Sequence, residues 1–223
     1  MAVSNTQIRR EREREERRAS ILSAARSVFF TQGIHDTTVD DIASAAEVSK
    51  GTVYLYFQNK ETILAVLLQE GLETLAKVLE EAFGSAETIP APMRLRRLAQ
   101  AYFDYFHSNP HYYRLLIQFE RKKFQESIDP DLYEQTLLRS TRGLTYVVRA
   151  LEQGVSEGDF FVQDPKREAS VLWAMLHGVY VVLGHPLRRE MLAADLESLY
   201  GSAVDLAIRG LSAPVFDQTG RGN

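Results

Sequence analysis

Apolar residues recur at helical spacing along most of the chain, beginning near residue 19. The first set shares one face of a 3.6-residue period and consists of Ile21, Leu22, Ala25, Val28 and Phe29. Gly33 follows, and glycine commonly ends a helix because it adopts left-handed backbone without strain. The alternation typical of half-buried strands is absent from the sequence. The pattern therefore predicts an all-α fold.

Two short helices are expected after this first one. Thr38 stands before VDDIASAAE, and Asp41 three residues later completes the pattern of a capping box. Ser49 is placed to cap the next helix, on which Val53 and Phe57 are expected to face the core. The side chains that fall largely off that face are Lys50, Thr52, Tyr54 and Tyr56. Three helices with a short turn between the last two predict a helix-turn-helix.

Six amphipathic segments follow Asn59, which is positioned to cap the first of them. They cover residues 62–83, 90–109, 110–126, 130–159, 165–186 and 195–211. We therefore expect a charged N-terminal arm, a helix-turn-helix domain, a larger helical domain and a disordered tail. Their expected bounds are 1–18, 19–62, 63–212 and 213–223.

The arm contains IRREREREERR, in which opposite charges interleave. Charges three and four residues apart pair along a helix, so a solvated helical extension is the simplest interpretation. Two interpretations of its role stay open. One is a solvated or partly disordered arm, and the other is an arm whose arginines reach phosphates.

The composition is that of an ordinary globular protein of 223 residues, with 45% hydrophobic and 25% charged residues. The absence of cysteine excludes disulfides, cysteine-based zinc sites and thiol nucleophiles, and it suits a reducing cytoplasm. The sequence has no uncharged run of about 18 residues and no secretory signal pattern, so we expect no membrane partner.

The net charge of −4 is unevenly distributed. Residues 1–60 carry nine Lys and Arg against eight Asp and Glu, whereas the remainder carries 17 against 22. A basic lead-in on an acidic body can mark an end that binds nucleic acid.

Patterns of catalytic and metal-binding residues are missing from the sequence. It contains no glycine-rich phosphate loop, no G-x-S-x-G, no H-E-x-x-H and no Glu-x-x-His pair, and its five histidines are scattered. We therefore expect no enzymatic activity, no cofactor and no metal site.

The segment 21–67 resembles the TetR family of bacterial transcriptional regulators. The resemblance rests on AARSVFFTQG, TTVDDIA, GTVYLYF and the following NKE, all at one fixed spacing. It covers about a fifth of the chain closely, and the remainder matches the family in being helical and of the usual length. It implies a DNA-binding helix-turn-helix domain followed by a helical domain for effector binding and dimerisation.

The resemblance also implies a homodimer that binds a palindromic operator, usually as a repressor, and leaves it when a small molecule binds. The positions that it places near DNA are Thr38, Ser49, Lys50, Gly51, Thr52, Tyr54, Tyr56 and Lys60. We assign Lys50 and Thr52 to base edges or adjacent phosphates, and the hydroxyls of Tyr54 and Tyr56 to phosphates. Gly51 would allow close approach to another surface. For each tyrosine, packing on the domain core is the alternative.

Of the eight positions, Thr38 and Lys60 stand at helix N-termini, where a phosphate is favoured.

The alternative to a DNA-binding regulator is a ligand-insensitive helical binding or scaffold protein that uses its helix-turn-helix for protein contacts. A protein interface has no need for Lys50, Tyr56 and Lys60 together, so the sequence favours DNA. Operator, regulated genes, effector identity and the direction of regulation are not encoded in these patterns.

Aromatic side chains are dense in the larger domain, and most are expected in its core. Ligand pockets are mostly apolar with a few polar groups, so some of these residues are candidates for an effector pocket. The candidates are Phe103, Phe106, His107, Tyr113, Phe119, Tyr146, Trp173 and His177. This lining predicts a hydrophobic or amphipathic effector, such as a fatty-acyl compound, an aromatic metabolite or a drug. For the two histidines, a satisfied place in the core is the alternative.

Two apolar stripes mark the last two expected helices. One consists of Val171, Leu172, Met175, Leu176, Val179, Val182 and Leu183. The other consists of Leu196, Leu199, Tyr200, Ala203, Val204, Ala207 and Leu211. We expect these helices to form a four-helix interface in a homodimer, with ordinary intrachain core as the alternative. The helix 60–83 is expected to couple the two domains.

Overall fold

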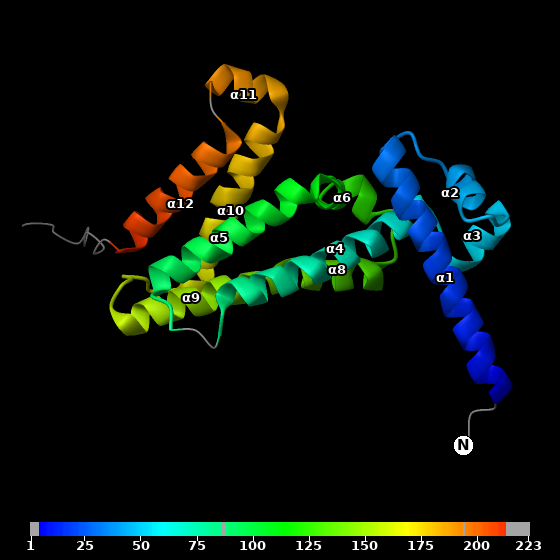
Figure 1. The fold of residues 1–223 in the computed structure, drawn as a ribbon, viewed down its shortest axis with the longest axis horizontal. Helices are drawn as coiled ribbons and strands as arrows, with labels where there is room; N and C mark the ends of the chain where they lie inside the picture. Colours follow the sequence, from blue (N-terminus) through cyan, green and yellow to red (C-terminus); the bar gives the residue numbers. More distant parts are fainter. Residues whose placement is uncertain (1–4, 86–87, 194, 213–223) are drawn as a thin grey trace, which may run out of the picture. The chain divides into compact units, whose positions relative to one another are not determined.

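A computed structural model describes residues 5–85, 88–193 and 195–212, and these residues form helices joined by turns, without a strand (Figure 1). The predicted all-α fold is confirmed. The chain divides into two compact units, one made of Met1–Glu73 and Asn109–Ser140 and the other of Thr74–Ser108 and Thr141–Asn223. The tail expected over 213–223 lies outside the described residues, and the domain bounds given above stay a prediction.

The first unit contains the expected helix-turn-helix. Its helices are α1 (Asn5–Gln32), α2 (Val39–Ala45), α3 (Lys50–Tyr56), the first part of α4 (Lys60–Phe83), α6 (Pro110–Phe119), α7 (Lys122–Gln125) and most of α8 (Pro130–Arg142). The turn after α1 begins at Gly33, whose φ of +92° lies in the left-handed region that favours glycine. The five apolar residues predicted to share one face of α1 are all buried, which confirms that face.

The charged arm is helical from Asn5 onward and continues into the rest of α1 without a break. The expected helical extension is thus confirmed for the described part of the arm. Its opposite charges pair one turn apart, as between Arg9 and Glu13, which supports a helix that has no apolar face of its own.

The second unit consists of the last part of α4, α5 (Ala91–Ser108), α9 (Leu144–Glu157), α10 (Pro165–Gly184), α11 (Pro186–Leu192) and α12 (Leu196–Ser212). Both α5 and α10 pack against α9 and α12. The buried Tyr200 ties two of these helices together, because its hydroxyl donates to the Ala99 carbonyl at 3.0 Å. Gly154 lets the ring of Phe160 lie against α9, since an added Cβ would be 2.0 Å from the Phe160 Cδ2.

The segment predicted as one helix over 130–159 is two helices, so that expectation was wrong. The break falls at Gly143, between α8 and α9. A Cβ at this position would lie 2.7 Å from the Leu79 Cδ1 of α4, so the leucine side chain occupies the space that glycine leaves open. Glycine is also a poor helix former.

Two short helices, α7 and α11, also differ from the expected segments. The segment 110–126 is divided into α6 and α7 because Arg121 is extended, and this bend lets Phe124 pack on Phe119 at a ring distance of 6.0 Å. Helix α11 was not predicted. It begins at Pro186, a favoured first helical residue, and ends at Leu192, followed by the C-cap Ala193 with a φ of +47°.

Candidate nucleic-acid interface

The N-terminus of α2 carries the predicted capping box. The Thr38 hydroxyl accepts from the Asp41 N–H at 3.2 Å, and the Thr38 N–H donates to Asp41 Oδ2 at 2.8 Å. Hydrogen bonds from the Thr38 side chain and backbone hold the pKa of Asp41 below its ordinary value, so this carboxylate is ionised at neutral pH. The box fixes the point at which α2 leaves the turn.

The N-terminus of α3 is capped by Ser49, as predicted. Its hydroxyl accepts from the Thr52 N–H at 3.1 Å and lies 2.8 Å from the Thr52 hydroxyl. The two hydroxyls therefore shape the first turn of α3 together. They stay on the surface, where a polar partner can reach them.

The two faces of α3 differ sharply in burial. Val53 is 0% exposed and Phe57 is 2% exposed, which confirms both as core residues. Tyr54 is 47% exposed and Tyr56 is half-buried, so neither ring belongs to the fully buried core. Leu55 is 79% exposed, and the sequence pattern did not single it out. The outer face thus combines hydroxyls, a cation and apolar surface.

Lys50 projects from the first turn of α3 and forms an exposed ion pair. Its Nζ lies 2.6 Å from the Asp40 Oδ2 on α2. The hydrogen bond to Asp40, followed by the charge of that carboxylate, raises the pKa of Lys50, so the ammonium remains charged. Sequence reasoning missed Asp40 as the partner, although a carboxylate one helix away was visible in VDDIASAAE.

Replacing Asp40 by Asn should strengthen DNA binding modestly. The Asp40→Asn variant loses a carboxylate that both holds Lys50 and repels phosphate, whereas exposed pairs of this kind contribute little to folding. We expect a roughly two- to fivefold rise in affinity for any duplex, measured by fluorescence anisotropy at low salt. An Asp36→Asn variant, at an exposed position in the preceding turn, is the control, and an equal rise in both would argue against release of Lys50.

Lys60 has an intramolecular role that the sequence did not reveal. Its Nζ donates to the Ile34 carbonyl at 2.9 Å and to the Thr37 carbonyl at 3.0 Å. The first residue of α4 thereby holds the turn between α1 and α2. An ammonium has three N–H donors, so one remains for a further acceptor.

Gly51 occupies an open position on the exposed face of α3. A Cβ added there would meet only the Ser49 hydroxyl, at 3.7 Å, which is an ordinary contact. Its φ is not in the left-handed region, so the fold itself does not require glycine at this position.

Five of the eight candidates for the effector pocket form one connected cluster in the second unit. Phe103 stacks with His107 at a ring distance of 5.5 Å, and Trp173 stacks with His177 at 5.0 Å. The His177 Nδ1 lies 3.3 Å from the Tyr102 hydroxyl. The ring of Phe106 connects these two stacked pairs. It contacts Tyr102, which is the neighbour of His177, and Tyr180, which contacts Phe103.

The other three candidates lie elsewhere. Tyr146 packs on Phe83 of α4 in the second unit, at a ring distance of 5.8 Å. Tyr113 and Phe119 belong to the first unit, where Phe119 stacks with Tyr133 at 5.3 Å. Six of the eight candidates thus belong to the second unit and two to the first.

A groove in the second unit has a different lining. It has a volume of about 460 Å³ and is formed by the connection after α9 together with α10 and α12. Its lining residues are Phe161, Val162, Gln163, Asp164, Arg167, Glu168, Val171, Leu172, Met175, Ala207, Gly210 and Leu211. None of the predicted pocket residues is among them.

The two apolar stripes on α10 and α12 are divided between core and surface. Their buried members are Leu172, Leu183, Tyr200, Val204 and Leu211. Exposed apolar side chains on the same helices include Val171, Trp173, Val181, Val182, Leu199 and Leu206. Intrachain packing thus accounts for part of each stripe and leaves an apolar surface on both helices.

A membrane-spanning role has no support in the helices. Among the described residues, none of the helices is both long enough and apolar enough to cross a bilayer.

Comparison with known families matches most of the chain. Residues 21–67 match the family described as bacterial regulatory proteins, tetR family. Residues 95–206 match the domain described as tetracyclin repressor-like, C-terminal. The first match contains α2 and α3, and the second covers half of the chain.

Individual relatives agree with these matches. The HTH-type transcriptional activator FasR of Mycolicibacterium smegmatis is 33% identical over 105 residues, which span 47% of this chain and only 47% of that protein. The uncharacterized HTH-type transcriptional regulator YhgD of Bacillus subtilis is 26% identical over 89% of this chain and 98% of that protein. The structure of the TetR family transcriptional regulator PfmR from Thermus thermophilus has a TM-score of 0.64 at 26% identity, covering 86% of this chain and 99% of that one.

Proposed function

The chain belongs to the TetR family of bacterial regulatory proteins, and from this membership we propose a homodimeric repressor that leaves a palindromic operator when a small hydrophobic molecule binds. Its membership makes it a DNA-binding transcriptional regulator. The observation that carries the proposal is the division of α3 into two faces. Val53 is buried, whereas Lys50, Gly51 and Tyr54 are exposed on the outward face. A helix of this kind fits the major groove.

The proposed contacts follow from the chemistry of that face. Lys50 and Thr52, in the first turn of α3, are assigned to base edges, where lysine donates to guanine and the threonine methyl meets thymine. The hydroxyls of Tyr54 and Tyr56 are assigned to phosphates. The remaining proposed members of the interface are Thr38, Ser49, Gly51 and Lys60. Of these, Lys60 would use the N–H that it does not donate to the turn.

The dimer would form through the exposed apolar surface of α10 and α12. Burial of such surface against a symmetric copy is the usual driving force for a two-fold interface. The two recognition helices would then reach successive major grooves, about 34–36 Å apart.

A charge in this surface should weaken the dimer. The Leu206→Glu variant places a carboxylate on α12 at a side chain that is 61% exposed in the monomer, so folding should be unaffected. We expect the dissociation constant of the dimer to rise at least about tenfold in sedimentation experiments. Leu138→Glu, at an exposed leucine of α8, is the control. A Leu206→Glu protein that dimerises like the wild type would contradict the assignment.

The effector site is proposed at the aromatic cluster of α5 and α10. Trp173 is the single tryptophan of the chain, so its fluorescence reports directly on this cluster. Lauric acid and a hydrophobic aromatic acid are suitable probes. Binding should change the Trp173 emission, raise the unfolding temperature and release the operator. Release of the operator with unchanged Trp173 emission would place the effector elsewhere.

Selection from random duplexes tests the function as a whole. Purified protein should enrich a palindrome with half-sites about one helical turn apart. A promoter carrying this palindrome should then be less active in cells that express the protein. Higher activity would make the protein an activator, and no enrichment by a folded dimer would overturn the proposal of operator-specific binding.

A further inference from the structure

The N-terminal half of α1 extends well beyond the folded part of the first unit. It runs from Asn5 to Ile21, the first fully buried residue of the helix, a distance of about 24 Å at 1.5 Å per residue. All side chains over residues 6–17 are exposed. Figure 1 shows this half of α1 continuing past α2 and α3. The exposed stretch ends at Arg18, whose guanidinium lies 5.2 Å from the centre of the Phe57 ring. A charged helix that is exposed all round over this length is available for a partner outside the fold.

Two arginines of this extension are neutralised within the helix. The Arg9 Nε lies 2.9 Å from the Glu13 Oε1, and the Arg12 Nε lies 2.8 Å from the Glu16 Oε1. In each pair the two residues are exposed and one helical turn apart, so the pair supports the helix and the two charges cancel.

Three other arginines make no ion pair within the described part of the chain, namely Arg10, Arg14 and Arg17. Steps of four and then three residues place them on one face of α1. The next steps along that face reach Ile21 and Val28, which are buried in the first unit. The arginine stripe is therefore continuous with one edge of the face that α1 buries in the first unit.

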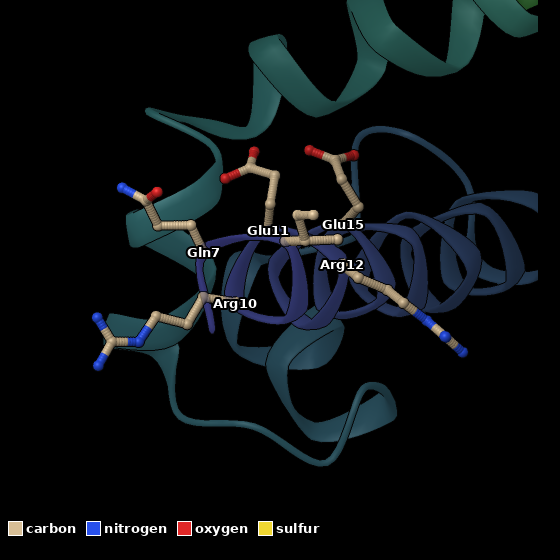
Figure 2. A pocket seen from close by; sticks show the side chains of 6 residues that line it. Gln7, Arg10, Glu11, Arg12 and Glu15 are labelled. Atoms are coloured by element: carbon tan, nitrogen blue, oxygen red, sulfur yellow. The ribbon is translucent and has the colours of Figure 1, made fainter. Parts of the chain in front are cut away.

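The remaining acidic residues, Glu11 and Glu15, are in line with the other edge of the buried face, which carries Leu22 and Phe29. Figure 2 shows Glu11 and Glu15 directed to the same side of α1, with Arg10 directed away from them. These side chains belong to a shallow surface pocket lined by Gln7, Ile8, Arg10, Glu11, Arg12 and Glu15, all from this one helix. The helix is thus segregated by charge, although its overall charge is only slightly positive.

We propose that Arg10, Arg14 and Arg17 bind the DNA backbone beside the segment held by α3. The proposal rests on the operator binding proposed above and adds a second contact region to it. The stripe complements the charge of phosphate, is continuous with the helix-turn-helix through α1, and is held rigid by the helix. Backbone contacts carry no base preference, so the arm adds affinity and leaves the preferred sequence unchanged.

An exchange of charges within the arm tests the position of the stripe separately from its net charge. The variant R10E/E11R/R14E/E15R keeps the composition of the arm but moves two arginines one residue around the helix, off the proposed face. A second variant, R10Q/R14Q/R17Q, removes the stripe with residues of similar helix propensity. Circular dichroism and the dimer fraction establish that each variant is folded.

Binding is measured by anisotropy on the selected operator, once as a duplex that ends at the operator and once with about ten base pairs added at each end. For the wild type we expect at least tenfold tighter binding to the longer duplex. Both variants should lose this gain and keep the operator preference. In R10Q/R14Q/R17Q, the slope of log K against log salt should become shallower by roughly 0.9 for each phosphate that the arm no longer binds.

The outcomes separate this inference from the proposed function. If the wild type enriches no operator, the operator-specific function fails. If it binds an operator but gains nothing from the flanks, or if R10E/E11R/R14E/E15R gains as much as the wild type, the arginine stripe is not a contact region while the function stands. Loss of binding in R10Q/R14Q/R17Q alone would show an effect of net charge and would also overturn the inference.

Discussion

The Gly51→Ala variant is expected to bind its operator about a hundredfold more weakly than the wild type while folding at least as well. The added Cβ has an ordinary contact at 3.7 Å inside the chain, and alanine exceeds glycine in helix propensity by up to about 1 kcal/mol. The free energy of unfolding should therefore stay constant or rise. The same Cβ would stand on the exposed face of α3, between the helix and the groove.

The size of the effect follows from the contacts at stake. A good base contact discriminates by about 1–3 kcal/mol, and a dimer presents two recognition helices, so even one displaced contact in each half-site costs about a hundredfold. Anisotropy titration measures the affinity, and urea denaturation measures the stability. Gly184→Ala, an open glycine at the end of α10, is the matched control for the effect on folding. A Gly51→Ala protein with wild-type affinity would show that α3 does not approach DNA closely at this point.

The Lys60→Met variant is expected to lose about 2–3 kcal/mol of unfolding free energy as well as affinity for DNA. Methionine keeps most of the length of the side chain but removes the ammonium that donates to the carbonyls of Ile34 and Thr37. Hydrogen bonds from charged donors contribute about 1.5–3 kcal/mol each, and part of this is regained from water at a half-buried site. The turn before α2 should loosen, and with it the position of the helix-turn-helix.

Urea denaturation compared with the Lys77→Met variant tests this role. Lys77 is exposed on the same helix, so its replacement removes a charge without removing a bond to the turn. We expect the midpoint of Lys60→Met to fall clearly and that of Lys77→Met to stay near the wild type. Binding to all duplexes should also weaken in Lys60→Met, with a lower salt slope. Unchanged stability together with weaker binding would make Lys60 a phosphate contact alone.

The two predictions show different relations between sequence and site. The open position of Gly51 follows from its place in a short helix, and local reasoning reached it. The bonds of Lys60 join residues more than 20 positions apart, and no spacing rule connects a lysine with two carbonyls in a distant turn. The ion pair between Lys50 and Asp40 could be predicted only in part. Both charges were visible in the sequence, but their 2.6 Å contact depends on the angle between α2 and α3.

What the sequence determined by itself was local and periodic. Helical spacing of apolar residues, the caps Thr38 and Ser49 and the terminator Gly33 predicted α1, α2 and α3, because backbone preferences and side-chain caps act within a few residues. Only the tertiary structure decided which side chains meet. Gly143 divides a long apolar pattern where α4 passes closely, and the pocket candidates separate between two units, because packing partners are chosen by shape across the fold and leave no period in the sequence.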